Sequence, residues 1–317
     1  MVLNFLCNRK KVSEEVKENH GVVSIAGHKE KESSWINQDS FVVEVVNGSS
    51  SGSNIEQEQK PTTIIGVFDG HGPSGHLISA HCSKAIVSKL ESNNRCAKKA
   101  LEQLQEELEG EDFTSASGTT CALILLLEGR VEAYNIGDSQ AFLGYRDGDH
   151  GKLKHILLTS DHSPSSDTEA ERIKNAGGGV YKKSDEEPLR VWYKCSKTKK
   201  TVGLAMTRSL GDCSAHKVGV SCEPNELRRP ITKDDEFIVV CSDGVTDVID
   251  PEEVTIMIDH YMSSLPPDEY KYDWDPQEAA NIVVSKARKR WADRKNIDDV
   301  TCCVIKLRDD ENHFYLE

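Results

Sequence analysis

The sequence lacks the features of secreted, membrane-spanning and zinc-binding proteins. It has ten cysteines, but none forms the C-x-x-C pair of a zinc knuckle or a thioredoxin-type redox site. No apolar run reaches the roughly 18 residues that a membrane helix needs, and the apolar start of the chain is too short for a signal peptide. Val2 rules out the usual N-myristoylation motif. We therefore expect no stable membrane insertion and a cytoplasmic location, with the nucleus left open.

Positive charge is also scarce. The chain carries 39 Lys and Arg against 53 Asp and Glu, which gives a formal net charge of -14. Such a surface repels the phosphate backbone, so a nucleic-acid partner is not expected. The surplus of carboxylates suits hard divalent cations, although an Asp or Glu taken singly is usually solvated surface.

The chain contains no internal repeat and no linker long enough to divide it, so a single domain is predicted. We expect a flexible leader at residues 1–19, one domain over residues 20–310 and a short tail at residues 311–317. Residues 47–61 are rich in Ser and Gly and have little to bury, which predicts a mobile loop. The protein is expected to be a monomer.

The hydrophobic pattern predicts an α+β fold. Helices are expected over residues 74–90 and 95–109 and from residue 167, and two Asp-Pro pairs, at 250–251 and 275–276, mark further helix starts. Apolar, β-branched strands are expected at residues 21–26, 40–46, 62–68, 121–127, 131–136, 141–145, 154–158, 237–241 and 300–307. Because several strands follow one another without a helix between them, antiparallel sheets with helices packed outside are favoured over a doubly wound parallel sheet.

Four aspartates stand at predicted strand ends. Asp69, Asp138 and Asp243 each follow an apolar strand, and Asp298 precedes one. In antiparallel neighbours the end of one strand lies beside the start of the next, so four strands can bring four carboxylates to one edge. Like charges at such an edge raise one another's pKa unless a cation neutralises them, and oxygen ligands favour Mg²⁺ or Mn²⁺ over zinc. The alternative is that Asp-Gly makes an ordinary hairpin turn, and these positions alone leave both interpretations open.

His71 lies two residues after Asp69, in Asp69-Gly70-His71-Gly72. The flanking glycines predict a turn that leaves the imidazole accessible. Its ordinary pKa of about 6.5 suits proton transfer at cellular pH. A histidine in a loop is usually plain polar surface, but this one stands beside a candidate metal ligand.

Nine segments taken together resemble the type 2C metal-dependent protein serine/threonine phosphatases over about residues 20–308. They occur in the family's order, and although each is weak alone, the series is highly specific. The segments are residues 37–40 (NQDS), 66–72 (GVFDGHG), 117–120 (SGTT), 135–139 (NIGDS), 158–162 (LTSDH), 171–173 (ERI) with 177–178 (GG), 204–212 (LAMTRSLGD), 242–248 (SDGVTDV) and 298–301 (DDVT).

The resemblance implies a central antiparallel β-sandwich flanked by α-helices on both sides, in α-β-β-α layers, with two Mg²⁺ or Mn²⁺ ions at one end. Asp69 would bridge both ions and the Gly70 carbonyl would bind one of them. Asp243 and Asp298 would hold the other ion, and Asp39 would act through a coordinated water.

A third, weaker ion site is implied at Asp138 together with Asp243. The implied reaction is hydrolysis of phosphoserine or phosphothreonine in protein substrates, by direct attack of a metal-bridging water on phosphorus. His71 would act as the general acid that protonates the leaving oxygen. These roles imply a signalling phosphatase whose partners are phosphorylated proteins.

The sequence departs from the family at Ser34. Many relatives carry Arg or Lys at this position, where it binds the substrate phosphate, and a neutral hydroxyl cannot replace a charge-assisted contact. Cations that could compensate are Lys29, Lys31, Arg190 and Arg208, of which Arg208 is the predicted substrate-binding residue. The departure leaves open a catalytically weak or inactive binding or scaffold protein with the same fold. An esterase of small phosphates is a further alternative.

Residues 181–222 correspond to the family's variable flap beside the active site. Lys194, Lys197, Lys199 and Lys200 make this segment a basic island on an acidic protein. The pattern is compatible with a plain solvated hairpin and with recognition of acidic or phosphorylated segments.

Overall fold

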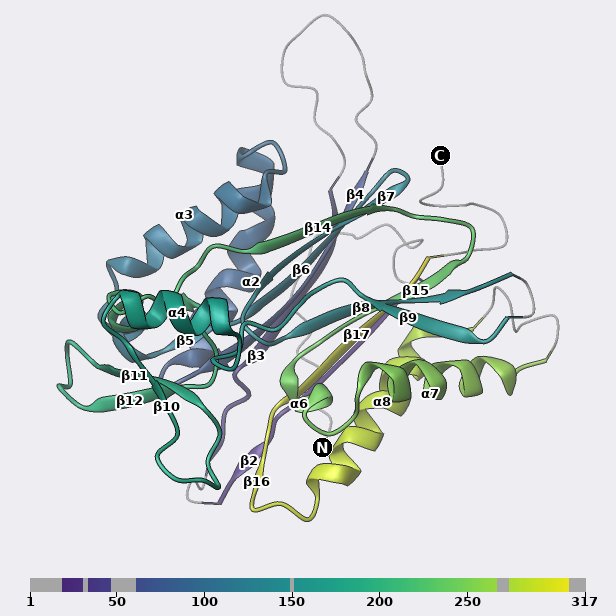
Figure 1. The fold of residues 1–317 in the computed structure, drawn as a ribbon. Helices are drawn as coiled ribbons and strands as arrows, with labels where there is room; N and C mark the ends of the chain where they lie inside the picture. Colours follow the sequence, from purple (N-terminus) through teal and green to yellow (C-terminus); the bar gives the residue numbers. More distant parts are fainter. Residues whose placement is uncertain (1–18, 31–33, 47–60, 149–150, 267–273, 308–317) are drawn as a thin grey trace, which may run out of the picture.

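The computed structural model describes residues 19–30, 34–46, 61–148, 151–266 and 274–307 (Figure 1). The predicted tail, nearly all of the predicted leader and nearly all of the loop at 47–61 lie outside these residues. Within the described ranges, no helix combines the length and the apolar character needed to cross a membrane.

Two antiparallel sheets form the centre of the molecule. The first has the strand order β1-β17-β15-β8-β9. Its strands are β1 (His20–Ile25), β8 (Gln140–Arg146), β9 (Leu153–Leu157), β15 (Asp235–Cys241) and β17 (Val300–Lys306). The second has the order β13-β5-β4-β6-β7-β14, with β3 paired to β4. Its strands are β3 (Asp39–Val46), β4 (Thr62–His71), β5 (Gly118–Thr119), β6 (Cys121–Leu127), β7 (Arg130–Ile136), β13 (Leu210–Gly211) and β14 (Asn225–Pro230).

Helices cover the outer face of each sheet, as Figure 1 shows. Helices α2 (Gly75–Ser92) and α3 (Ala97–Glu109) lie against the second sheet, and α7 (Pro251–Ser263) and α8 (Pro276–Trp291) lie against the first. The described residues therefore form four layers, helix, sheet, sheet and helix. The predicted α+β fold class with antiparallel sheets is confirmed.

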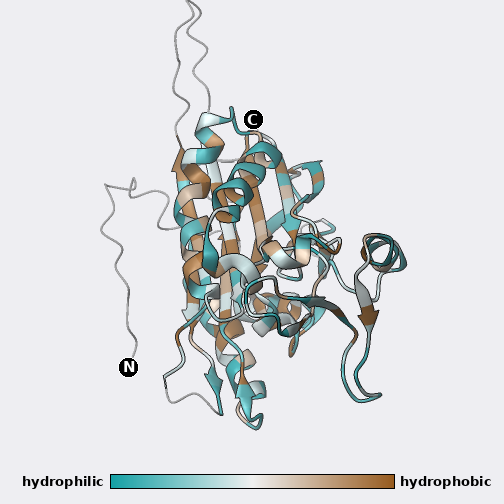
Figure 2. Cartoon of the chain, turned by 90° about the vertical axis from the view of Figure 1, so that its left-hand side faces the viewer, coloured by the Kyte–Doolittle hydropathy of each residue, from teal (hydrophilic) through white to brown (hydrophobic). Residues whose placement is uncertain are grey.

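The alternation of side chains along the strands produces three separate apolar layers. On β4, Ile65 and Val67 belong to the core between the sheets, whereas Ile64 and Phe68 pack under α2 and α3. β15 divides its side chains in the same way, between the sandwich core and the layer under α7 and α8. Successive strand residues point to opposite faces, so a strand covered on both sides must be apolar throughout. Figure 2 shows the apolar colouring concentrated on these central strands.

The predicted Asp-Pro helix starts are confirmed. Asp250 Oδ1 accepts a hydrogen bond from the Glu253 N–H (2.8 Å) before α7, and Asp275 Oδ1 accepts one from the Gln277 N–H (2.8 Å) before α8. Helix α4 (Asp167–Asn175) begins at the predicted residue, with Ser166 at its cap position.

Smaller elements gather at the end of the sandwich where β4 finishes (Figure 1). They are the pair β2 (His28–Lys29) and β16 (Asn296–Ile297), helix α6 (Asp243–Thr246), the 3₁₀ turn η1 (Asp112–Ala116), helix α5 (Cys213–His216), and the sheet of β10 (Gly179–Tyr181), β11 (Arg190–Lys194) and β12 (Thr201–Leu204). β11 and β12 lie in the predicted flap segment. They share a small apolar cluster of their own with α4 and α5, which includes Ile173, Val191 and Leu204.

Candidate active site

The strand pairing brings the predicted metal ligands to one end of the sandwich. Asp39 and Asp69 are direct cross-strand partners on β3 and β4. Asp243 lies two residues beyond β15 and Asp138 two residues before β8, and these two strands pair with each other. Asp298 leads into β17, the other neighbour of β15. The charges of Asp39, Asp138, Asp243 and Asp298 all act on Asp69, so the five predicted carboxylates form one cluster.

Burial and mutual repulsion make four of these five carboxyl groups hard to ionise. Burial, followed by the neighbouring aspartates, raises the pKa of Asp69 and Asp243 well above the ordinary value. For Asp39, burial and then the charge of Asp299 raise the pKa to about 7. Burial and the charge of Asp161 raise the pKa of Asp138 to about 6. An added cation would relieve this cost, because it stabilises the ionised form that burial disfavours.

Two unpartnered oxygens fit the same interpretation. Asp39 Oδ1 and Asp138 Oδ1 are buried and accept no hydrogen bond from any residue that the structure describes. Asp39 Oδ2 accepts one from Ser242 Oγ (2.7 Å), and the Asp69 N–H donates to Thr120 Oγ1 (3.0 Å), which fixes the strand ends. Buried acceptors without a donor are costly, and a divalent cation would satisfy them.

The donor set therefore fits a hard divalent ion. Across the described ranges, however, no three His, Cys, Asp or Glu side chains are already grouped as ligands of one ion. The strand ends are fixed, so rotation of the aspartate side chains alone would bring these ligands together around an ion.

The glycines after Asp69 and Asp243 are required by close backbone packing and not by turns, which corrects the expectation from the sequence. A Cβ at Gly70 would lie 2.5 Å from the Gly75 carbonyl oxygen, and a Cβ at Gly244 would lie 1.8 Å from the Asp299 carbonyl oxygen. β4 continues through Gly70 to His71, and Asp243 begins α6. Neither Asp-Gly pair forms a hairpin turn, so that alternative is wrong.

His71 is also less open than the sequence suggests. It is the last residue of β4 and its side chain is 21% exposed. Its Nε2 lies 2.5 Å from Oδ2 of the buried Asp212, which also accepts a hydrogen bond from Ser209 Oγ (2.7 Å). Burial lowers the pKa of His71, but the charge and hydrogen bond of Asp212 outweigh it, so the pKa is raised. The buried Nδ1 has no hydrogen-bond partner among the described residues.

Asp212 is a functional candidate that the sequence interpretation did not assign. It lies 141 positions from His71, and its φ of 41° places it in the left-handed region, just before α5. The only signal was its place at the end of the segment 204–212, since no local pattern could predict its contact with the imidazole.

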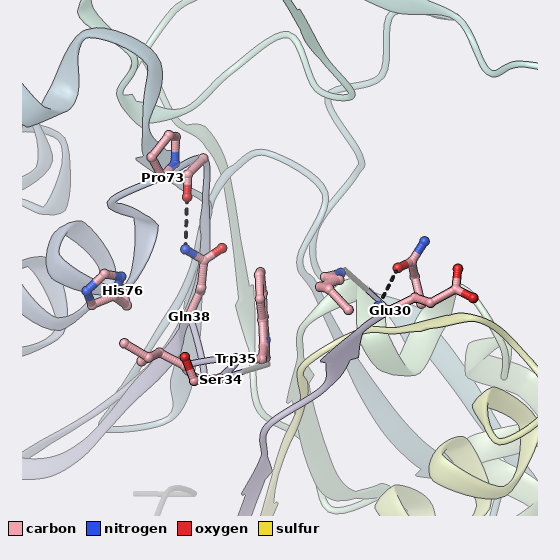
Figure 3. A pocket seen from close by; sticks show the side chains of 10 residues that line it. Glu30, Ser34, Trp35, Gln38, Pro73 and His76 are labelled. Atoms are coloured by element: carbon pink, nitrogen blue, oxygen red, sulfur yellow. Dashed lines mark hydrogen bonds between the residues drawn. The ribbon is translucent and has the colours of Figure 1, made fainter. Parts of the chain in front are cut away.

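An open cavity of about 830 Å³ borders this end of the sandwich (Figure 3). Its lining residues are Lys29, Glu30, Ser34, Trp35, Ile36, Gln38, Gly72, Pro73, His76 and Asn296. Ser34, the predicted point of departure from the family, lies in this lining beside Trp35. Lys29 Nζ lies 3.0 Å from Asp298 Oδ1, so the cavity reaches the carboxylate cluster.

Arg208 is placed differently from the prediction that it binds substrate. Its guanidinium donates to both carboxylate oxygens of Glu169 (2.8 and 3.2 Å) and to the Glu223 carbonyl oxygen (2.7 Å). Arg172 and Thr207 also donate to the same Glu169 carboxylate. With its donors committed to this network, Arg208 has no support from the geometry as a phosphate-binding residue.

Comparison with known proteins identifies the family of this chain. The sequence matches the family described as Protein phosphatase 2C over residues 36–295. It is 31% identical over 308 residues to probable protein phosphatase 2C 61 of Arabidopsis thaliana, covering 92% of this chain and 85% of that protein. Probable protein phosphatase 2C 72 of the same plant is 30% identical over 275 residues, covering 80% and 78% of the two chains.

The fold has a counterpart among solved structures. The serine-threonine phosphatase 2C from Toxoplasma gondii superposes with a TM-score of 0.71 at 17% identity, covering 90% of this chain and 94% of that one. The sequence match, the four-layer fold and the carboxylate cluster lead to one conclusion. The chain belongs to the protein phosphatase 2C family and is a metal-dependent protein serine/threonine phosphatase.

Proposed function

We propose that this chain hydrolyses phosphoserine and phosphothreonine in proteins at the centre formed by the ends of β3, β4, β8, β15 and β17. The observation that supports the proposal most strongly is the buried carboxylate cluster, with its raised pKa values and unpartnered oxygens. A protein would not keep so many buried acids together for stability alone, because each costs free energy unless it is compensated.

Two Mg²⁺ or Mn²⁺ ions are proposed for this cluster. Asp69 and the Gly70 carbonyl would hold one ion, Asp69, Asp243 and Asp298 the other, and Asp39 would contribute through water. Asp138 with Asp243 is proposed for a third, weaker ion. When bound, such ions lower the pKa of water and neutralise negative charge, and so supply both the nucleophile and the stabilisation of the phosphoryl group.

The chain's own residues would position the strand ends and deliver a proton. Ser242 and Thr120 hold Asp39 and Asp69 through the hydrogen bonds described above. His71 donates through Nε2 to Asp212, which leaves its Nδ1 as the nitrogen able to give a proton to the leaving oxygen. The pKa of His71 is raised by the charge and hydrogen bond of Asp212, which favours the protonated ring that a general acid requires.

The test is release of phosphate from a phosphoserine peptide with and without added Mn²⁺, in the presence of okadaic acid. We expect Mn²⁺-dependent turnover that the inhibitor does not affect and that Asp243→Asn removes. A scaffold protein would show the same negligible rate for the parent and for Asp243→Asn. An esterase of small phosphates would turn over p-nitrophenyl phosphate much faster than the peptide. We also propose a monomer that acts in the cytoplasm, with the nucleus left open, which gel filtration and fractionation would check.

A further inference from the structure

We propose that Lys29 binds the phosphate group of the substrate at this centre. The role rests on the proposed function and supplies the positive charge that Ser34 does not. Three features of the structure support this role of Lys29: the anchoring of β2, the position of the Lys29 ammonium, and the composition of the cavity lining.

β2 is fixed to the segment that leads into β17. Lys29 is the cross-strand partner of Asn296, and the Glu30 N–H donates to Asn296 Oδ1 (3.3 Å). The Gly27 N–H donates to Asp299 Oδ1 (2.6 Å). Because β2 is held at both ends against residues 296–299, Lys29 keeps a defined position beside the metal-ligand candidate that this segment carries.

The ammonium of Lys29 lies at the edge of the carboxylate cluster. Its Nζ is 3.0 Å from Asp298 Oδ1 and 5.0 Å from the centroid of the Trp35 ring. Trp35 is itself held in place, since its indole N–H donates to Asp299 Oδ1 (2.8 Å). A lysine ammonium has three donors, so the contact with Asp298 leaves others for an anion. The side chain is 27% exposed, so a substrate in the cavity can reach it.

Among the residues that the structure describes, the cavity lining offers no other strong cation. Of its ten lining residues, Lys29 is the one lysine or arginine, and Ser34 and His76 are on the same lining. The lining continues to Gly72 and Pro73, directly after His71. A phosphate at Lys29 would therefore lie between the carboxylate cluster and the cavity, with the peptide in the open part.

The other compensating cations considered from the sequence fit less well. The guanidinium of Arg208 is bound by Glu169 and the Glu223 carbonyl, and Arg190 lies on β11, where it donates to the Gly203 carbonyl oxygen (3.4 Å). Lys31 lies outside the described residues. Neither described arginine lines the cavity.

The test measures binding of inorganic phosphate to the Mn²⁺-saturated chain by calorimetry. Lys29→Ala and Lys29→Met should weaken phosphate binding about tenfold to a hundredfold, the loss expected for one hydrogen bond to a charged group. Lys29→Met keeps the apolar stem against Trp35, so it serves if the alanine variant does not fold. Adding Ser34→Arg to Lys29→Ala should restore phosphate binding, because Ser34 lines the same cavity. Lys295→Ala is the matched control, since Lys295 is 81% exposed and forms an ion pair with Glu30 at the rim of the cavity (3.8 Å).

The alternative is that Lys29 only supports Asp298. In that case Lys29→Met would weaken Mn²⁺ binding, seen as a smaller thermal shift with Mn²⁺ alone, and leave phosphate affinity at saturating Mn²⁺ unchanged. That result would overturn the inference. The proposed function is tested separately by phosphopeptide turnover of the parent chain. Lys29-dependent phosphate binding without turnover would reject the proposed function alone, and turnover with Lys29-independent phosphate binding would reject this inference alone.

Discussion

Replacing Asp212 with Asn tests how the protein controls its candidate general acid. Asn keeps the size of the side chain and tolerates the left-handed backbone at this position, where φ is 41°. It removes the negative charge that lies 2.5 Å from His71 Nε2. A hydrogen bond to a charged group contributes about 1.5–3 kcal/mol, so the population of correctly oriented, protonated His71 should fall about tenfold to a hundredfold.

The assay compares two substrates that differ in their leaving groups. A serine oxygen needs a proton to depart, whereas the p-nitrophenolate of p-nitrophenyl phosphate needs little protonation. Asp212→Asn should therefore lower kcat for a phosphoserine peptide by about tenfold to a hundredfold, within the share that general acid catalysis contributes, and affect p-nitrophenyl phosphate much less.

Ser209→Ala is the matched control for this substitution. It removes one of the hydrogen bonds that Asp212 accepts but keeps the carboxylate beside His71, so its effect should be smaller. Equal losses of kcat on both substrates in Asp212→Asn, or an unchanged peptide rate, would refute the assignment of Asp212 as the residue that positions His71.

Two further predictions concern stability. Mn²⁺ should raise the melting temperature more at pH 7.5 than at pH 5, because the pKa of Asp39 is raised to about 7 in the ion-free chain and protons then compete with the ion. The pKa of Asp39 is higher in the folded chain than in the unfolded chain, so this residue stabilises the ion-free fold at low pH and loses that effect as pH rises through about 7. Scanning fluorimetry measures the melting temperature, and an increase with Mn²⁺ that is the same at both pH values would contradict the prediction. Gly244→Ala should reduce the free energy of unfolding in urea by about 3 kcal/mol or more, because its Cβ would meet the Asp299 carbonyl oxygen at 1.8 Å. Gly110→Ala, where a Cβ meets nothing within 4 Å, should change little, and equal stability of the two variants would show that the Gly244 contact relaxes freely.

Much of the fold could be predicted because its signals are local. The apolar strands such as β6 at 121–127 are buried on both faces, so their composition alone marks them. The Asp-Pro helix starts also depend only on neighbouring residues. β14 gave no such signal, since it lies at the edge of its sheet and carries charged residues such as Arg228 and Arg229.

The candidate site also has parts that the sequence predicts and parts that it does not. The clustering of Asp69, Asp243 and Asp298 follows from strand ends and could be expected from the sequence. The contact between His71 and Asp212 depends on how β4 and β13 are brought together around β5, which no local pattern encodes. In the sequence, Lys29 was one of several cations that could bind phosphate. The pairing of β2 with β16 distinguishes it from the others, and strands of two residues are too short to show any periodicity in the sequence.

The direct pairing of Asp39 with Asp69 also has a consequence for how the chain folds. The register that sets these two aspartates opposite each other also pairs Val43 with Ile65, and both of these side chains lie in the sandwich core. A slip of one residue would turn the apolar side chains of β3 to the wrong face and separate the two acids. Ion binding would therefore select correctly registered molecules during folding, and added Mn²⁺ would protect them from proteolysis while leaving misregistered chains open to cleavage.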